Sequence, residues 1–238
     1  AAGAASGRAR PASITAHFVG TGSSGPVDIT TTVNRSTRVA TSVTVTITQD
    51  DRPWLVAIAW GTDADLEGLD HHTRIVPDVA GPAGLPSTEQ LLQDDEGLPH
   101  PFWKNLEQRP LNWIADWAAR TAAEPSVAAW DRFVPTETFT DPWVDAARSL
   151  ILVDLDSWPS ATRAHVGELN HFAPTIEVTA RFIGDTRQEP WLLSEASTPR
   201  ASDGLLASTA HVWNTRRELV AVGGSTLLCR PAARRPDR

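Results

Sequence analysis

The chain has 238 residues, of which 41% are hydrophobic and 21% are charged, the mix of a globular protein rather than a disordered one. A formal net charge of −8 argues against non-specific nucleic-acid binding, which needs a basic surface. Cys229 is the only cysteine, so an internal disulfide and a thiolate metal cluster are both excluded. No apolar run approaches the ~20 residues that span a bilayer. We expect a cytoplasmic protein without a metal or a cofactor.

The first quarter of the chain is rich in strand signals. Residues 1–10 are small and resemble the last turn of a helix, and the lack of an initial methionine suggests a processed or truncated chain. A β-rich run follows at residues 13–19, and apolar and polar residues then alternate over 27–33, 39–47 and 54–60. This period of two predicts an antiparallel meander with one buried face.

The middle of the chain changes character. Residues 62–101 carry many Gly, Pro and Asp and predict a linker, whereas residues 102–117 regain aromatic side chains that should pack on another element. A strand is expected at 126–134. Asp141 and Pro142 then form a good start for a helix over 141–157, with Pro159 closing it. Four more strands are expected at 175–183, 191–197, 205–213 and 219–229.

Two separated stretches of the chain repeat. Residues 14–20 match 178–184, and Leu55-Val56-Ala57 matches Leu219-Val220-Ala221, each with an offset of 164. The chain is therefore interpreted as a tandem duplication, with an incomplete first unit at 1–64, a linker and packing segment at 65–124, and a complete second unit at 125–238. The first unit lacks one strand and most of its helix, so we expect residues 62–124 or a partner subunit to cover its apolar sheet face.

One strand, one long helix and an antiparallel sheet that wraps the helix describe an α+β hotdog unit, and two fused units make a tandem hotdog. The second half resembles the thioesterase II (TesB-type) acyl-CoA thioesterases. The residues that carry the resemblance are Asp141–Arg148, Asp154–Pro159, Pro174–Phe182 and Leu219–Ala221, and Phe102–Pro110 is similar to a segment of actinobacterial relatives.

The resemblance implies hydrolysis of acyl-CoA by a water that an Asp, a Thr and a Gln orient and activate. Asp154 occupies the aspartate position in the pattern Asp-Leu-x-x-x-Pro, with Asp156 as the alternative. Thr175 opens the next strand in a Thr-Ile-Asp/Glu pattern. Ser225 occupies the position of the glutamine.

The replacement of glutamine by serine bears on the activity. A carboxylate that accepts the proton of water typically contributes ~10²–10⁴-fold, and Asp154 and Thr175 meet two of the three needs. Ser225 is too short to replace an amide directly but can act through a second water. We expect weakened hydrolysis or a shifted substrate. The alternative is a non-catalytic acyl or acyl-CoA binding protein; a hydratase is less favoured, because neither unit shows an Asp/His dehydratase pattern.

The resemblance also implies where an acyl-CoA substrate would bind. The acyl chain would lie in an apolar tunnel beside the second helix, with the CoA phosphates near surface arginines. Arg163, Arg181 and Arg187 are the candidates. Hotdog proteins seldom act alone, so we expect a homo-oligomer, at least a dimer.

Overall fold

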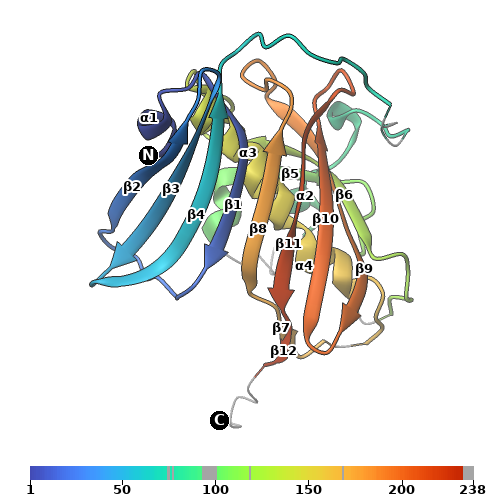
Figure 1. The fold of residues 1–238 in the computed structure, drawn as a ribbon. Coiled ribbons are helices and arrows are strands. Elements are labelled where there is room, and N and C mark those ends of the chain that lie inside the picture. The colour runs from blue at the N-terminus through green and yellow to red at the C-terminus, as the bar shows by residue number, and fades with distance from the viewer. Residues whose placement is uncertain (74–75, 77, 93–100, 118, 168, 233–238) are drawn as a thin grey trace.

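The computed structural model describes residues 1–73, 76, 78–92, 101–117, 119–167 and 169–232. Over these residues, ten strands form one antiparallel sheet in the order β2-β3-β4-β1-β8-β11-β10-β9-β6-β5 (Figure 1). Their bounds are β1 Arg10–Phe18, β2 Asp28–Ser36, β3 Ala40–Gln49, β4 Arg52–Thr62, β5 Leu106–Pro110, β6 Ser126–Phe133, β8 Thr175–Phe182, β9 Trp191–Ser202, β10 Leu205–Trp213 and β11 Leu219–Leu228. A separate ladder pairs β7 (His171–Phe172) with β12 (Arg230–Pro231).

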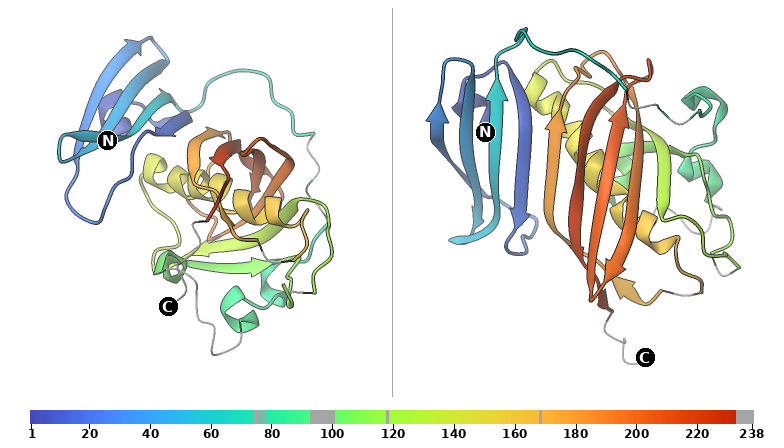
Figure 2. Two further views of the ribbon diagram at one scale, coloured as in Figure 1. Left: turned by 90° about the horizontal axis from the view of Figure 1, so that it is seen from below. Right: turned by 45° about the vertical axis from the view of Figure 1, so that its right-hand side comes forward.

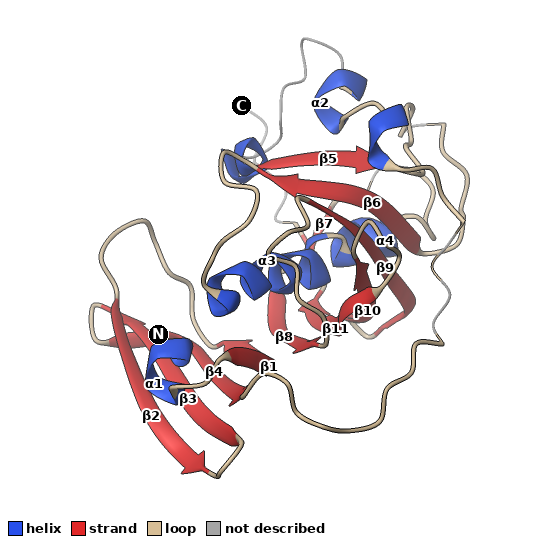
Figure 3. Cartoon of the chain, turned by 90° about the horizontal axis from the view of Figure 1, so that it is seen from above, coloured by secondary structure: helices blue, strands red, loops and turns tan. Residues whose placement is uncertain are grey.

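The helices are few and short apart from one. They are α1 (Ala2–Ser6), α2 (Thr88–Leu91), α3 (Pro142–Leu155) and α4 (Ser157–Thr162), with 3-10 turns η1 (Pro82–Gly84) and η2 (Pro101–Asn105). The sheet of the second unit curves around α3 and α4, as Figure 3 shows from above. In the part of the chain that the structure describes, no helix combines the length and the apolar character that crossing a membrane requires.

The duplication extends over four strands of each unit. With an offset of 164, β1, β2, β3 and β4 correspond to β8, β9, β10 and β11. The two units join where β1 pairs with β8, and in that ladder Thr15 lies opposite its own repeat mate Thr179, with their hydroxyl oxygens 2.9 Å apart. A pseudo-two-fold axis therefore passes between these two threonines. The tandem hotdog α+β fold is confirmed.

The strands do not follow one another in space as a simple meander. β1 lies beside β4 and β8 and not beside β2, so the segment between β1 and β2 closes no hairpin, and its first residues, Val19 and Gly20, instead donate to the carbonyl oxygen of Trp54 in β4. β5 was missed as a strand and pairs with β6 at the far edge of the sheet. Its charged residues and its terminal Pro110 gave no strand signal, yet an edge position tolerates a proline.

The helix α3 begins as expected and ends earlier. The carboxylate of Asp141 accepts a hydrogen bond from the amide of Trp143 at 2.8 Å, and Pro142 occupies the first turn. The chain breaks at Asp156 and restarts as α4, so Pro159 lies inside α4 and does not close α3. A proline near the start of a helix removes no required hydrogen bond. The break places Asp154 at the last turn of α3.

A close contact between helix and sheet fixes the position of α3. Leu152 and Val153 are fully buried against the sheet. A Cβ atom on Gly223 of β11 would lie 2.8 Å from a methyl carbon of Val153 and 2.1 Å from the carbonyl oxygen of Thr179. Only a glycine leaves room for α3 to approach the sheet at this point.

The expectation that residues 62–124 cover the first sheet is wrong for most of that segment. β5 and the neighbouring α2 pack beside β6 on the second unit, at the other end of the sheet (Figure 2). The short α1 lies on β2, β3 and β4, and all of β2 is exposed. The first sheet therefore keeps an apolar inner face, part of which lines a cavity.

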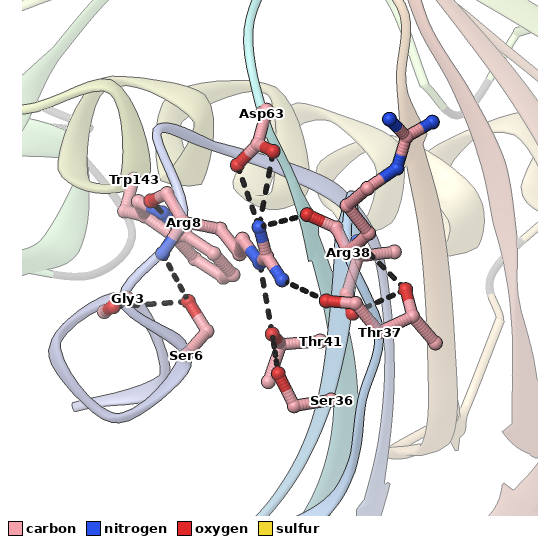
Figure 4. A network of polar contacts seen from close by, with 10 residues as sticks. Gly3, Ser6, Arg8, Ser36, Thr37, Arg38, Thr41, Asp63 and Trp143 are labelled. Atoms are coloured by element: carbon pink, nitrogen blue, oxygen red, sulfur yellow. Dashed lines mark hydrogen bonds and ion pairs between the residues drawn. The ribbon is translucent and has the colours of Figure 1, made fainter.

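The N-terminal segment ties the two units together through one arginine (Figure 4). The guanidinium of Arg8 donates to both carboxylate oxygens of Asp63, at 2.8 and 3.0 Å, and to the hydroxyl of Thr41 at 2.9 Å. The indole of Trp143, in the first turn of α3, donates to the carbonyl oxygen of Arg8 at 2.9 Å. α3 is thus held by the first unit as well as by its own sheet.

Candidate active site

Two of the three expected site residues meet in the structure. The hydroxyl of Thr175 donates a hydrogen bond to Oδ1 of Asp154 at 2.9 Å. Asp154 comes from the last turn of α3 and Thr175 is the first residue of β8, so the helix end and the strand start bring them together. Both side chains are half-buried, which leaves one face of the pair accessible.

The pair opens into a cavity of about 640 Å³ between α3 and the sheet of both units. Apart from Asp154 and Thr175, its lining is apolar. The wall from the first unit consists of Ala2, Ile14, Ala16, Phe18, Val45, Ile47, Leu55 and Ala57, and the rest is Phe102, Leu150, Ile151, Leu155, Trp158, Ala173, Val178 and Leu227. One carboxylate and one hydroxyl in an apolar chamber of this size are typical of a site that binds an apolar ligand and acts on its polar end.

Ser225 lies close to this site without lining the cavity. It is 4% exposed, faces Val178 in the β8–β11 ladder, and its amide donates to the hydroxyl of Ser208 at 3.0 Å. Its own hydroxyl has no hydrogen-bond partner among the described residues. Leu227 is two positions further along β11, roughly 7 Å from Ser225. It faces Thr175 in the ladder and lines the cavity.

Asp156, the alternative carboxylate, points to a different cluster. It lies beside Asp131 of β6, and the amide of Gln108 donates to both, at 3.4 Å to Asp156 and 3.2 Å to Asp131. Ser194 donates to the other oxygen of Asp131 at 2.7 Å. Both carboxylates are at least 97% buried. This cluster does not include Thr175, so the structure pairs that threonine with Asp154 alone.

Burial shifts the titration of this second pair. Burial raises the pKa of Asp156 to about 6. Burial, and then the charge of Asp156, raise the pKa of Asp131 well above its usual range, against the hydrogen bonds from Ser194 and Gln108. Two carboxylates this close cannot both ionise cheaply, so the pair holds one proton near neutral pH.

The three arginines expected to bind phosphates have different surroundings. Arg187 forms an exposed ion pair with Asp185 at 2.6 Å. Arg163 donates to the carbonyl oxygen of Asn112 at 3.0 Å. Arg181 is exposed on β8. None of the three lines the cavity that holds Asp154.

Three residues of this region were not singled out as site residues from the sequence, although Gln108 and Trp158 lie in segments that carry the family resemblance. Gln108 and Asp131 come from β5 and β6, and only the folded sheet brings them to Asp156. Trp158 lines the cavity from α4. A tryptophan directly before Pro159 offers no pattern from which such a position follows, whereas the acid pair at Asp154 and Asp156 was visible in the sequence.

A tandem hotdog fold with a carboxylate–hydroxyl pair beside an apolar cavity places the chain among the double-hotdog proteins. The family comparison makes this specific. The model of the acyl-CoA thioesterase N-terminal domain matches residues 1–62, and the model of the acyl-CoA thioesterase C-terminal domain matches residues 82–226. The chain belongs to the acyl-CoA thioesterase family.

Solved structures agree on the fold. An acyl-CoA thioesterase II from Mycobacterium marinum superposes with a TM-score of 0.76 at 19% identity, covering 94% of this chain and 82% of the other. A TesB protein from Mycobacterium avium superposes with a TM-score of 0.71 at 18% identity, covering 93% of this chain and 79% of the other. A hotdog protein from Alicyclobacillus acidocaldarius superposes with a TM-score of 0.75 at 18% identity, covering 94% of this chain and 80% of the other. The comparison with curated proteins gave no match.

Proposed function

We propose that the protein hydrolyses acyl-CoA thioesters, with Asp154 as the general base for the attacking water and Thr175 as the group that orients that water through its hydrogen bond to the carboxylate. The observation that carries the proposal is the 2.9 Å hydrogen bond from Thr175 to Asp154 at the polar end of the apolar cavity. Family membership supports the reaction class, and the cavity offers a place for the acyl chain.

The reaction needs only one carboxylate and one water. The water oxygen attacks the carbonyl carbon of the thioester while Asp154 accepts a proton from that water. The tetrahedral intermediate then collapses, the carbon–sulfur bond breaks, and the proton passes from Asp154 to the departing CoA sulfur. The hydrogen bond from Thr175 occupies Oδ1 of Asp154 and so leaves Oδ2 to receive the proton.

Ser225 takes part in this proposal through a second water. Buried hydroxyls are nearly always hydrogen-bonded, to protein or to ordered water. The hydroxyl of Ser225 has no partner among the described residues, and its strand neighbour Leu227 lines the cavity. A water held by Ser225 at the edge of the cavity would fill part of the role that the family's glutamine amide has, less rigidly, so we expect a slower reaction.

The second candidate is a protein that binds acyl-CoA without hydrolysing it. The observation that favours it is the place of Ser225, which does not line the cavity with Asp154 and Thr175. A site that holds the ligand but orients the water through only two groups would retain affinity and lose turnover.

The deciding experiment incubates the purified protein with acyl-CoAs of increasing chain length and follows CoA release with a thiol reagent. We expect turnover, and we expect Asp154→Asn to lower kcat by about 10²–10⁴-fold because the base is lost. Asp185→Asn, which changes an exposed carboxylate far from the cavity, is the control and should retain full activity.

Two results separate the candidates. Binding of acyl-CoA by calorimetry without any CoA release would establish the binding protein and overturn the hydrolase. Turnover that survives intact in Asp154→Asn would leave hydrolysis in place but remove Asp154 from it.

A further inference from the structure

A second hollow of about 640 Å³ shares Trp158 with the cavity that holds Asp154. The side chain of Trp158 lines both, so it forms a wall between them. Trp158 follows Asp154 by four residues, about one helical turn, across the short break between α3 and α4. A ligand whose reacting carbonyl lies at Asp154 therefore has this hollow as a neighbour.

The lining of the second hollow combines flat aromatic surface with positive charge. It consists of Trp117, Arg120, Trp158, Pro159, Thr162, Gly167, Leu169 and His171. The guanidinium of Arg120 lies 4.9 Å from the ring centroid of Trp117, and the indole of Trp117 is 47% exposed. No carboxylate is among these lining residues of the described chain.

Hydrogen bonds hold the segment that carries Trp117 and Arg120 against the residues at the end of α4. Nε of Arg120 donates to the carbonyl oxygen of His165 at 3.1 Å, and its Nη1 donates to that of Trp117 at 2.6 Å. Arg163, at the end of α4, donates to the carbonyl oxygen of Asn112 and accepts from the amide of Ala123 through its own carbonyl at 2.8 Å. The aromatic ring and the cation are thus placed by the backbone around them.

Further positive charge lies next to the hollow. His171 of β7 lines it and pairs with Pro231 of β12, and the adjacent Arg230 lies over the ring of Phe172, 5.1 Å from its centroid. In a chain with a net charge of −8, Arg120 in a lining without carboxylates, with Arg230 close by, is favourable for a phosphate-bearing ligand.

The hollow around Arg187 has the opposite character. It measures about 590 Å³ and contains two arginines, Arg10 and Arg187, but also three carboxylates, Asp65, Asp145 and Asp185. Asp185 already pairs with Arg187 at 2.6 Å. Asp145 is paired with Arg148 at 3.1 Å, so the charges around this hollow only balance, and it offers no excess positive charge to the phosphates that Arg187 was expected to bind.

We infer that the hollow lined by Trp117 and Arg120 binds the phosphorylated adenine nucleotide end of a CoA thioester. The adenine stacks on the exposed indole of Trp117, as bases do on aromatic side chains that bind nucleotides. A phosphate meets Arg120, whose planar fork suits it. The pantetheine arm then passes Trp158 and carries the thioester to Asp154. This inference rests on the proposed function for the identity of the ligand.

The test measures the affinity of the full-length protein for CoA itself by calorimetry, which requires no turnover. Arg120→Ala and Trp117→Ala should each weaken CoA binding about tenfold. Arg187→Ala is the control, because Arg187 belongs to the competing hollow, and it should bind CoA as the wild type does.

A second substrate guards against a folding defect. An acyl N-acetylcysteamine thioester carries the same reacting group without the nucleotide, so both variants should hydrolyse it at the wild-type kcat/KM while their KM for acyl-CoA rises about tenfold. Unchanged CoA affinity in Arg120→Ala, weakening in Arg187→Ala instead, or no CoA binding by the wild type would each overturn the inference. If the protein hydrolyses no thioester, the proposed function fails and the calorimetric comparison still decides the nucleotide site.

Discussion

At the scale of single residues, the carboxylates divide into two kinds. Asp154 is half-buried, bonded to Thr175 and open to a cavity, whereas Asp131 and Asp156 are buried against each other with the neutral side chains of Gln108 and Ser194 around them. The first arrangement suits a base that must exchange protons with a ligand. The second stores a proton inside the protein.

The buried pair predicts how stability depends on pH. In the folded protein the pKa of Asp156 is raised to about 6 and that of Asp131 further, in both cases first by burial, while both are near 3.9 in the unfolded chain. The folded state therefore binds protons more tightly. The stability that the protonated Asp131–Asp156 pair contributes is fully present below about pH 4 and is lost as pH rises through 6 and beyond. Asp131→Asn removes the repulsion between the two carboxylates. Between pH 5 and 8 the free energy of unfolding of this variant should therefore fall by less than that of the wild type, the difference being on the order of 1–3 kcal/mol.

Denaturant unfolding of both proteins at several pH values checks this. Asp185→Asn serves as the control, because an exposed ion pair with Arg187 lowers the pKa of Asp185 and leaves it ionised across the whole range. Parallel curves for wild type and Asp131→Asn would show that the pair does not hold a proton.

Ser225 supports a second prediction at this scale. Ser225→Ala removes the hydroxyl proposed to hold a water at the cavity edge. A hydrogen bond of this kind is worth about 1 kcal/mol, so kcat should fall about fivefold with KM unchanged. Steady-state kinetics with one acyl-CoA measures it, and Ser208→Ala, which affects the neighbouring hydroxyl that bonds the Ser225 amide, provides a comparison. An unaltered kcat in Ser225→Ala would exclude Ser225 from the reaction.

At the scale of elements, the fold depends on how α3 is held in the curved sheet. Arg148 of α3 is 1% exposed. It donates twice to Asp145, each at 3.1 Å, to the carbonyl oxygen of Glu189 at 3.0 Å and to that of Thr186 at 2.6 Å. These bonds join α3 to the segment between β8 and β9.

Removing that arginine should be costly. Arg148→Met leaves Asp145 buried without its cation, which typically costs about 3–5 kcal/mol. The matched control is Arg187→Met, because the exposed pair with Asp185 should be worth about 0–1 kcal/mol. Guanidinium unfolding of the two variants measures both. Equal losses would mean that Arg148 does not anchor α3.

The elements also show what the sequence could reveal. The two sequence matches at an offset of 164 located two of the four repeated strand pairs, β1 with β8 and β4 with β11, and the structure shows that β2 and β3 correspond to β9 and β10 at the same offset. The repeat in the sequence could not reveal that β1 lies beside β4, because the order of strands in a sheet depends on tertiary packing. Asp154 and Thr175 were accessible because each stands in a short motif, whereas Gln108 and Asp131 meet Asp156 only through β5 and β6. The bounds proposed for the three segments of the chain stay a prediction.

At the scale of the whole molecule, one continuous sheet joins the two units. The Thr15–Thr179 contact and the bond from Trp143 to Arg8 are the structural reasons to expect both units to behave as one body. The sheet ends at β2, whose residues are all exposed, with Ile29 and Val33 about half exposed. An unpaired edge with apolar side chains is a surface that another chain can pair with.

We therefore predict that the protein forms at least a dimer through this edge. Light scattering coupled to size exclusion should give a mass at least twice the 25.7 kDa of one chain. Ile29→Lys, which places a charge on β2, should shift the population toward the single chain, and Thr209→Lys on the central strand β10 is the control. A wild-type mass of one chain at micromolar concentration would contradict the prediction.

The proposed reaction depends on Asp154 and Thr175 acting together on one water. A double-mutant cycle on kcat/KM tests this most directly. Asp154→Asn should lower kcat/KM by about 10²–10⁴-fold and Thr175→Ala by roughly 10–100-fold, the worth of a hydrogen bond to a charged group.

Because the threonine acts only through the carboxylate, the double variant should be no slower than Asp154→Asn alone. Losses that multiply in the double variant would show that the two residues act independently, and the carboxylate–hydroxyl pair would not be the centre of the site.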